Sequence, residues 1–167
     1  MIRRLIAIAL LTIAVPALAQ QPVPAANYTD LWWNSQENGW GVTFTQSRAT
    51  NNVFAIWYTY DPREPDASPG NYKPLWIVMS GGTWTSPTSI TGPVYVLHGV
   101  PFFQSGTLRQ PGSDPQTQVG SFTFTFANAQ SGTFTYNIQP PANLPQSDPA
   151  FGLPAFSGTK DIVRLPF

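Results

Sequence analysis

The sequence predicts an all-β protein, an antiparallel meander of about eight to nine strands that forms a barrel or a two-layer sandwich. Charged residues make up only 10% of the chain, whereas aromatic residues make up 14%, and there are 18 prolines and 13 glycines. Few charges and many turn-forming residues argue against amphipathic helices, and abundant Thr, Val and aromatic residues favour strands. Apolar and polar residues also alternate along several segments, which is the pattern of half-buried strands.

The alternating segments and the turn signals between them give the expected strands in order. They lie near residues 30–33, 40–46, 53–60, 74–80, 91–98, 106–109, 119–127, 132–138 and 157–165. Two Pro-rich connections, residues 61–72 and 139–154, cannot pair as strands and are expected to be surface loops or lids. We prefer a barrel to a sandwich because closure removes exposed sheet edges in a chain that has no disulfides.

The N-terminal segment has the features of a secretory signal peptide. Arg3 and Arg4 precede an apolar run that ends near Val15, and a small-x-small cleavage site ends at Ala19. We therefore expect residues 1–19 to be removed and the protein to be secreted or periplasmic, with no integral membrane segment in the mature chain. Residues 20–27, rich in Pro and Ala, are expected to be a disordered leader, and residues 28–167 a single domain.

Charge and cysteine content exclude several classes of function. Removing Arg3 and Arg4 leaves six basic and eight acidic residues in the mature chain, a formal charge of about −2 without any basic run. This argues against binding to nucleic acid or to an anionic membrane surface. There is no cysteine and a single histidine, His98, so neither a disulfide nor a zinc site is expected. Nothing in the sequence implies a cofactor.

The densest aromatic stretch is residues 31–46, which places three of the six tryptophans within nine residues around a glycine-bearing turn. Trp32 and Trp33 are consecutive, and consecutive strand residues face opposite sides of a sheet. At least one of these two rings must therefore meet a second buried layer, a ligand or water.

Residues 53–79 are apolar on both faces of their strands. Phe54, Ile56, Tyr58 and Tyr60 alternate with Val53, Ala55 and Trp57, and Leu75, Ile77 and Met79 alternate with Trp76 and Val78. A contiguous exposed apolar patch is costly in an exported protein. The candidates to cover the second face are the Pro-rich loops or a second sheet, a ligand, and a partner chain.

The tryptophan-rich turn resembles a family of exported bacterial domains of uncharacterised function, with the signature W-W-N-P-x-E-S-G-W-G. The matching segments are residues 28–34, 39–42, 54–61, 73–79 and 132–136, with the chain end near Arg164 and Phe167. Ser35 stands where the family commonly has proline, and Asn38 where it commonly has serine. The resemblance implies export and an all-β module, and it supplies no catalytic or binding residue. A closed meander would have the shape of lipocalin or avidin barrels.

Sugar or small-ligand binding is the favoured function, in a non-catalytic module. Indole rings stack on the apolar faces of sugar rings while nearby polar side chains bind the hydroxyl groups. The candidate ligand-binding residues are Trp33, Glu37, Trp40, Trp57, Trp76 and Trp84.

Four alternatives stay open. The same tryptophans can belong to the core, or they can meet another envelope protein in an interaction or assembly domain. A hydrolase using Glu37 or His98 is less favoured, because no G-x-S-x-G motif accompanies the histidine and most of the acidic residues fall in turns. An outer-membrane barrel is also less favoured, because Thr and Ser fill the outer face of the later strands.

Overall fold

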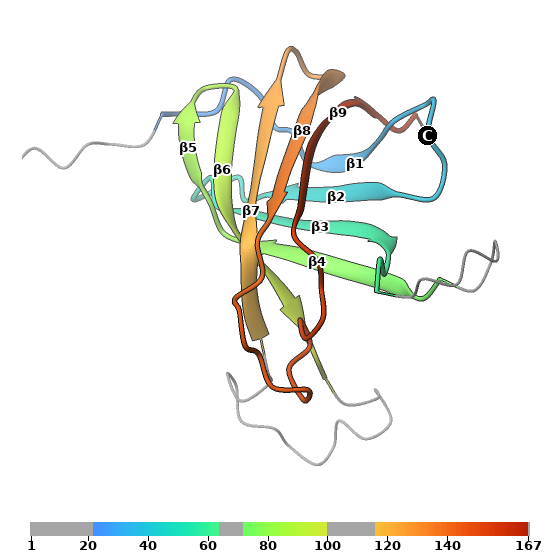
Figure 1. Cartoon of the computed structure of the whole chain (residues 1–167). Coiled ribbons are helices and arrows are strands. Elements are labelled where there is room, and N and C mark those ends of the chain that lie inside the picture. The colour runs from blue at the N-terminus through green and yellow to red at the C-terminus, as the bar shows by residue number, and fades with distance from the viewer. Residues whose placement is uncertain (1–21, 64–71, 100–115, 167) are drawn as a thin grey trace, which may run out of the picture.

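The computed structural model describes residues 22–63, 72–99 and 116–166, and these form one antiparallel sheet closed into a barrel (Figure 1). The strands are β1 (Asp30–Trp33), β2 (Gly41–Gln46), β3 (Val53–Tyr60), β4 (Pro74–Ser80), β5 (Thr83–Ser86), β6 (Ser89–Leu97), β7 (Gln116–Phe126), β8 (Ser131–Ile138) and β9 (Phe156–Arg164). Within these described ranges, no helix is long and apolar enough to cross a membrane. The prediction of an all-β antiparallel barrel is confirmed.

Closure depends on one short ladder. The sheet runs in the order β4-β3-β2-β1-β9-β8-β7-β6-β5, and β4 also pairs with β6 through Ile77 opposite Val96 and Val78 opposite Tyr95. Eight strands thus form the barrel, and β5 is an additional strand beside β6. In Figure 1, β1 to β4 cross the direction of β7 to β9, so the two halves of the wall enclose one core.

Eight of the nine expected strands coincide with β1 to β4 and β6 to β9. The expected strand at residues 106–109 lies outside the described residues. The sequence did not predict β5, because Trp84 is the only apolar residue among its four, Thr83–Ser86. The N-terminal residues 1–19, expected to be a signal peptide, also lie outside the described residues.

Aromatic side chains fill the interior of the barrel. Phe122, Phe124 and Phe126 of β7 point inward, as their alternation with Ser and Thr predicts. The Phe44 ring lies edge-on to Phe124 and Phe126 at centroid distances of 5.1 and 5.3 Å, and Phe122 lies edge-on to Phe134 at 4.9 Å. Burying such a ring stabilises the fold by about 2 to 3 kcal/mol. A ligand must therefore bind at an end of the barrel or on its outside.

One end of the barrel is closed by Tyr28 and Trp84. The Tyr28 ring stacks on Phe126 at 3.8 Å, and the Trp84 indole N–H donates to the main-chain oxygen of Asn51 at 2.9 Å. Residues 22–27, where the composition predicts a disordered leader, run along this end. The Ala25 N–H donates to the oxygen of Pro87 at 2.7 Å, in the turn between β5 and β6.

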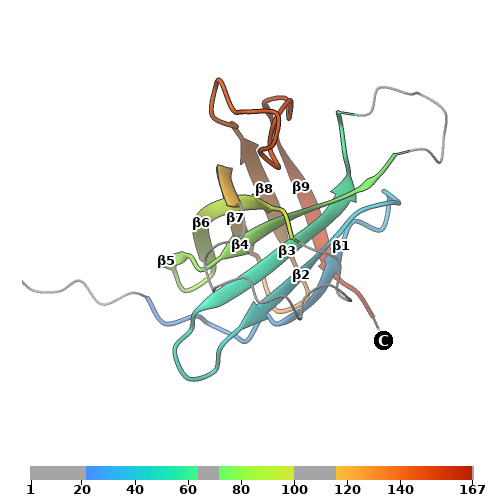
Figure 2. The ribbon, with the colours of Figure 1, turned by 90° about the horizontal axis from the view of Figure 1, so that it is seen from below.

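The connection between β8 and β9, residues 139–155, folds back near the opposite end (Figure 2). Arg63, just after β3, donates from Nη1 to the main-chain oxygens of Pro149 at 2.7 Å and Phe151 at 3.0 Å. Arg63 also pairs with Asp61 at 2.6 Å. Burial raises the pKa of Asp61, but hydrogen bonds from Arg63 outweigh it and lower that pKa. Asp61 thus holds Arg63, whose hydrogen bonds to Pro149 and Phe151 join the end of β3 to the β8–β9 connection.

A bulge in β7 requires glycine at position 120. Gly120 has φ 145°, and the register with β6 shifts beside it. A Cβ at this position would collide with the main-chain oxygen of Asn137 on β8. Gly81 also has a positive φ, 97°, but no atom lies within 4 Å of its Cβ position.

We expect Gly120→Ala to lower the free energy of unfolding by about 3 kcal/mol, because it combines backbone strain with a collision against main chain. Gly81→Ala is the matched control, because it introduces the backbone strain without the collision. It should lower the free energy of unfolding by only about 1 kcal/mol. Urea denaturation followed by circular dichroism measures both. Equal losses in the two variants would contradict the role of the Asn137 carbonyl.

Candidate functional site

The turn between β1 and β2 holds two of the predicted site residues over the open end of the barrel. The Asn34 side chain accepts a hydrogen bond from the Gln36 N–H at 2.8 Å, and the Glu37 N–H donates to the Asn34 oxygen at 3.1 Å. Gly39 then adopts φ 89°, a conformation that favours glycine. The chain reverses there, and Trp40 packs against the edge of the core.

Five strand residues face this turn from the inside of the barrel wall, and Thr59 of β3 is one of them. Trp57 on β3 and Phe134 on β8 belong to the core. Lys160 on β9 lies directly opposite Phe134, and directly opposed residues share a face of the sheet, so Lys160 also points inward. Tyr136, two residues after Phe134, packs its ring 4.7 Å from that of Trp57. The inward face of the wall thus ends in three aromatic rings, one hydroxyl and one cation.

Together these residues enclose a cavity of about 220 Å³, which we call the mouth pocket. Its lining consists of Glu37, Trp40, Trp57, Thr59, Phe134, Tyr136 and Lys160. The Trp40 ring lies 6.3 Å from Phe134, and Trp57 lies edge-on to Phe134 at 5.4 Å. Most of the wall is aromatic, and the polar groups gather on one side of it.

Glu37 is the centre of the polar side of the mouth pocket. Lys160 Nζ donates to Glu37 Oε1 at 2.7 Å, and the Trp40 indole N–H donates to Oε2 at 2.9 Å. The hydrogen bond from Lys160, followed by that from Trp40, lowers the pKa of Glu37, and the hydrogen bond to Glu37 raises the pKa of Lys160. Both groups are therefore charged at neutral pH.

The Glu37–Lys160 pair still has capacity for a ligand. The Lys160 and Glu37 side chains are 36% and 37% exposed, so solvent or a bound molecule reaches them. An ammonium group has three N–H donors and a carboxylate about four acceptor positions, so the contacts within the pocket use only part of this capacity. An ion pair this exposed contributes little to the stability of the fold, because solvent screens the two charges.

Trp57 adds a further polar group. Its side chain is buried, at 7% exposure, and its indole N–H has no hydrogen-bond acceptor among the described residues. A buried donor without an acceptor costs roughly 1 to 3 kcal/mol, which is unusual in a well-packed core. The indole N–H of Trp57 is therefore enclosed without a partner in the described part of the chain, as are the indole N–H of Trp33 and Nε of Arg164.

The structure brings together only part of the predicted site. Glu37, Trp40 and Trp57 meet in the mouth pocket. Trp33 is partly buried on the face of β1 opposite the core residue Trp32. Trp76 lies on the outer face of β4 with 61% of its side chain exposed, and Trp84 is enclosed at the opposite end of the barrel.

Sequence reasoning did not select Thr59, Phe134, Tyr136 or Lys160. For Lys160 a signal was present, because it stands between Gly158 and Ile162 on the inward face of the predicted strand at residues 157–165. Arg164 shares this face and packs over the ring of Trp32, so Lys160 is one of two cations on an inward strand face, where charges are uncommon. Its partner Glu37 is 123 positions away in the chain, so only the three-dimensional structure connects them.

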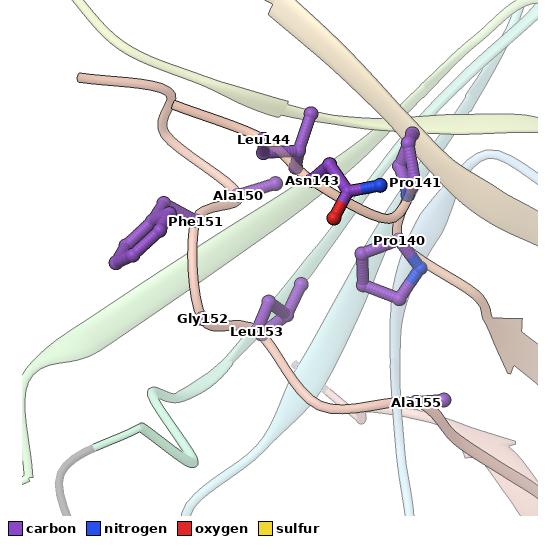
Figure 3. A pocket seen from close by; sticks show the side chains of 9 residues that line it. All are labelled: Pro140, Pro141, Asn143, Leu144, Ala150, Phe151, Gly152, Leu153 and Ala155. Atoms are coloured by element: carbon purple, nitrogen blue, oxygen red, sulfur yellow. The ribbon is translucent and has the colours of Figure 1, made fainter. Parts of the chain in front are cut away.

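A second cavity lies within the β8–β9 connection and has about 210 Å³ (Figure 3). Pro140, Pro141, Leu144 and Leu153 surround it, while the Phe151 ring turns away. Asn143 is the only polar side chain in its lining, and no charged group faces it. It offers few groups that would orient a ligand, so we do not assign it a function.

The described residues contain no group of three or more His, Cys, Asp or Glu side chains that could hold a metal ion. His98, which the sequence offers as a catalytic candidate, is exposed just after the end of β6. It does not line the mouth pocket, whose single carboxylate is Glu37.

We expect Glu37→Gln to lower the pKa of Lys160 toward its ordinary value of 10.5, because the charged acceptor that raises it is lost. In the unmodified protein, the pKa of Glu37 is lowered below 4.5, so the ion pair is lost at acidic pH only when the pH falls through this lowered pKa. At alkaline pH the ion pair is lost when the pH rises through the raised pKa of Lys160. NMR titration of the Lys160 side chain measures the change. Asp30→Asn, which removes the partner of Arg164, is the control and should leave the pKa of Lys160 unchanged.

The chain matches no model of a known protein family, and no curated protein or solved structure matches it. The resemblance to exported bacterial domains therefore stays a prediction from the sequence, and the mouth pocket is interpreted from its own geometry.

Proposed function

We propose that this protein is an exported, non-catalytic binding module whose mouth pocket takes one ring of an uncharged, polyhydroxylated ligand such as a sugar. The observation that carries the proposal is the inward-facing Glu37–Lys160 pair, set in a pocket walled by aromatic rings. The signal-peptide features of residues 1–19 support export.

The pocket combines two chemistries that a sugar ring needs. The rings of Trp40, Trp57 and Tyr136 offer apolar faces and edges to the C–H groups of a sugar. The Glu37 carboxylate can accept a hydrogen bond from one sugar hydroxyl, and the Lys160 ammonium can donate a hydrogen bond to the neighbouring hydroxyl. The two charges cancel, which favours a neutral ligand over an anion or a cation.

The size of the pocket limits the ligand to one ring or the end of a chain. Its volume is about 220 Å³. Pockets for drug-sized ligands are larger, on the order of 300 to 1,000 Å³. A single pyranose is therefore a better match than an extended molecule lying wholly inside.

The same geometry argues against hydrolysis. A glycosidase of the usual kind needs two carboxyl groups, one of them protonated. The lining has one carboxylate, and hydrogen bonds from Lys160 and Trp40 lower its pKa, which disfavours the protonated form. Glu37 is thus suited to accepting hydrogen bonds rather than to acting as a general acid.

The test is a titration with neutral monosaccharides and disaccharides, using uronic acids and amino sugars as charged comparisons. Binding is followed by tryptophan fluorescence and isothermal calorimetry. We expect Trp40→Ala and Lys160→Met each to weaken the affinity at least tenfold, about 1.4 kcal/mol. Phe151→Ala, which removes an exposed aromatic ring outside the pocket, is the matched control and should bind normally. Absence of binding to every neutral sugar, or normal binding by folded Trp40→Ala, would contradict the proposal.

A further inference from the structure

The outer face of β3 and β4 carries a concentration of exposed aromatic side chains, which we call the aromatic wall. It consists of Phe54, Ile56, Tyr58 and Tyr60 of β3 and Trp76 and Val78 of β4. The four aromatic side chains are between 38% and 61% exposed. The second apolar face predicted from the sequence is therefore real, and the described residues leave its rings accessible.

The strand register brings the side chains of the wall together. Ile56 lies opposite Val78, and Tyr58 lies opposite Trp76. The Tyr58 and Trp76 rings meet edge-on at 6.1 Å, and the Tyr58 hydroxyl lies 3.4 Å from the Thr43 hydroxyl. Successive outward residues on one strand are about 7 Å apart, so the row from Phe54 to Tyr60 extends over about 20 Å. The wall is thus a long, narrow row rather than a compact spot.

Among the described residues, no charged side chain stands on the outward face of the strands that form and flank the aromatic wall. The outward residues of β2 beside it include Thr43 and Thr45, and those of β6 include Pro93, Tyr95 and Leu97. Hydroxyl groups of Thr43, Tyr58 and Tyr60 stand among the rings. A charged partner would find no complementary charge on the described strands of this surface, whereas a neutral partner with C–H faces and hydroxyl groups matches it.

Exposed aromatic rings are not a general property of the outside of this barrel. On the opposite side, the outward face of β8 and β9 carries Ser, Thr and Asn residues with Asp161 and Val163 and no aromatic ring, and the hydroxyls of Thr135 and Thr159 lie 2.9 Å apart. Large exposed apolar patches on soluble proteins commonly mark binding surfaces. Because the exposed rings gather on the outer face of β3 and β4 and not on that of β8 and β9, the aromatic wall is the candidate binding surface.

We propose that the aromatic wall binds a neutral polysaccharide lying along β3. A linear polysaccharide presents a succession of apolar ring faces and hydroxyl groups, which corresponds to a row of aromatic rings interspersed with hydroxyls. Tyr60, at the end of the row, lies against the turn that carries Glu37 and Trp40, since a Cβ at Gly39 would be 3.1 Å from its ring. The wall thus leads to the rim of the mouth pocket, but binding along it requires no contact inside the pocket.

The experiment is affinity electrophoresis of the purified protein in native gels that contain a soluble β-glucan, a xylan or a galactomannan, with polygalacturonate as the acidic comparison. We expect at least one neutral polysaccharide to retard the protein. Trp76→Ala and Tyr60→Ala should each reduce this affinity at least tenfold, and both change exposed side chains. Phe151→Ala, which removes an exposed aromatic ring outside the wall, is the matched control and should be retarded normally.

Three outcomes would overturn the proposal. The first is the absence of retardation by every neutral polysaccharide. The second is retardation that Lys160→Met abolishes and Trp76→Ala leaves intact, which would assign the polysaccharide to the mouth pocket alone. The third is self-association in light scattering that disappears in Trp76→Ala, which would make the wall an interface between copies of this chain. Retardation that survives Lys160→Met and fails in Trp76→Ala supports the wall even if the mouth pocket binds no sugar.

Discussion

The packing of aromatic rings inside a closed eight-stranded barrel is the constraint on which the other features depend. An eight-stranded barrel is just wide enough to be filled by side chains or to hold one small ligand. Here Phe44, Phe122, Phe124, Phe126 and Phe134 fill it, and Tyr28 and Trp84 close one end. Recognition of a ligand is therefore left to the other end and to the outer wall.

The sequence predicts the later strands better than the earlier ones, for a physical reason. In β7 and β8 the apolar residues alternate with Ser and Thr, so only one face can be the core. In β3 both faces are apolar, and alternation alone cannot decide between them. The structure turns Ala55 inward opposite Phe44, where a larger residue would compete with the rings of β7 for space. Val53, Ala55 and Trp57 therefore face the interior of the barrel. The rings of Phe54, Tyr58 and Tyr60 lie on the outer face.

The same distinction between local and distant contacts explains how much of the candidate site was predictable. The spacing of Glu37 and Trp40 around a glycine turn is local, and the structure joins them by a hydrogen bond. Trp57 reaches the mouth pocket because β3 pairs with β2, its neighbour in the chain. That pairing is expected of a meander, but the sequence pattern does not show which face of β3 points inward. Lys160 depends on β9 returning beside β8 in one register, which no local pattern determines. Trp84 was selected for its residue type alone, and its enclosure follows from β5, a strand with a single apolar residue that the sequence pattern did not reveal.

The composition of the β1–β2 turn follows from the inward position of Lys160. An ammonium group at the edge of an aromatic core needs an anion within reach, because burial disfavours its charged form. Glu37 supplies that anion, and Trp40 holds the second oxygen of the carboxylate while its ring extends the apolar wall. Gly39, between Glu37 and Trp40, has a positive φ that lets the chain reverse, and the Tyr60 ring lies so close that a side chain at this position would be crowded. The turn, the cation and the end of the aromatic wall therefore form one connected unit, and a change in any of them alters the rim that a ligand meets.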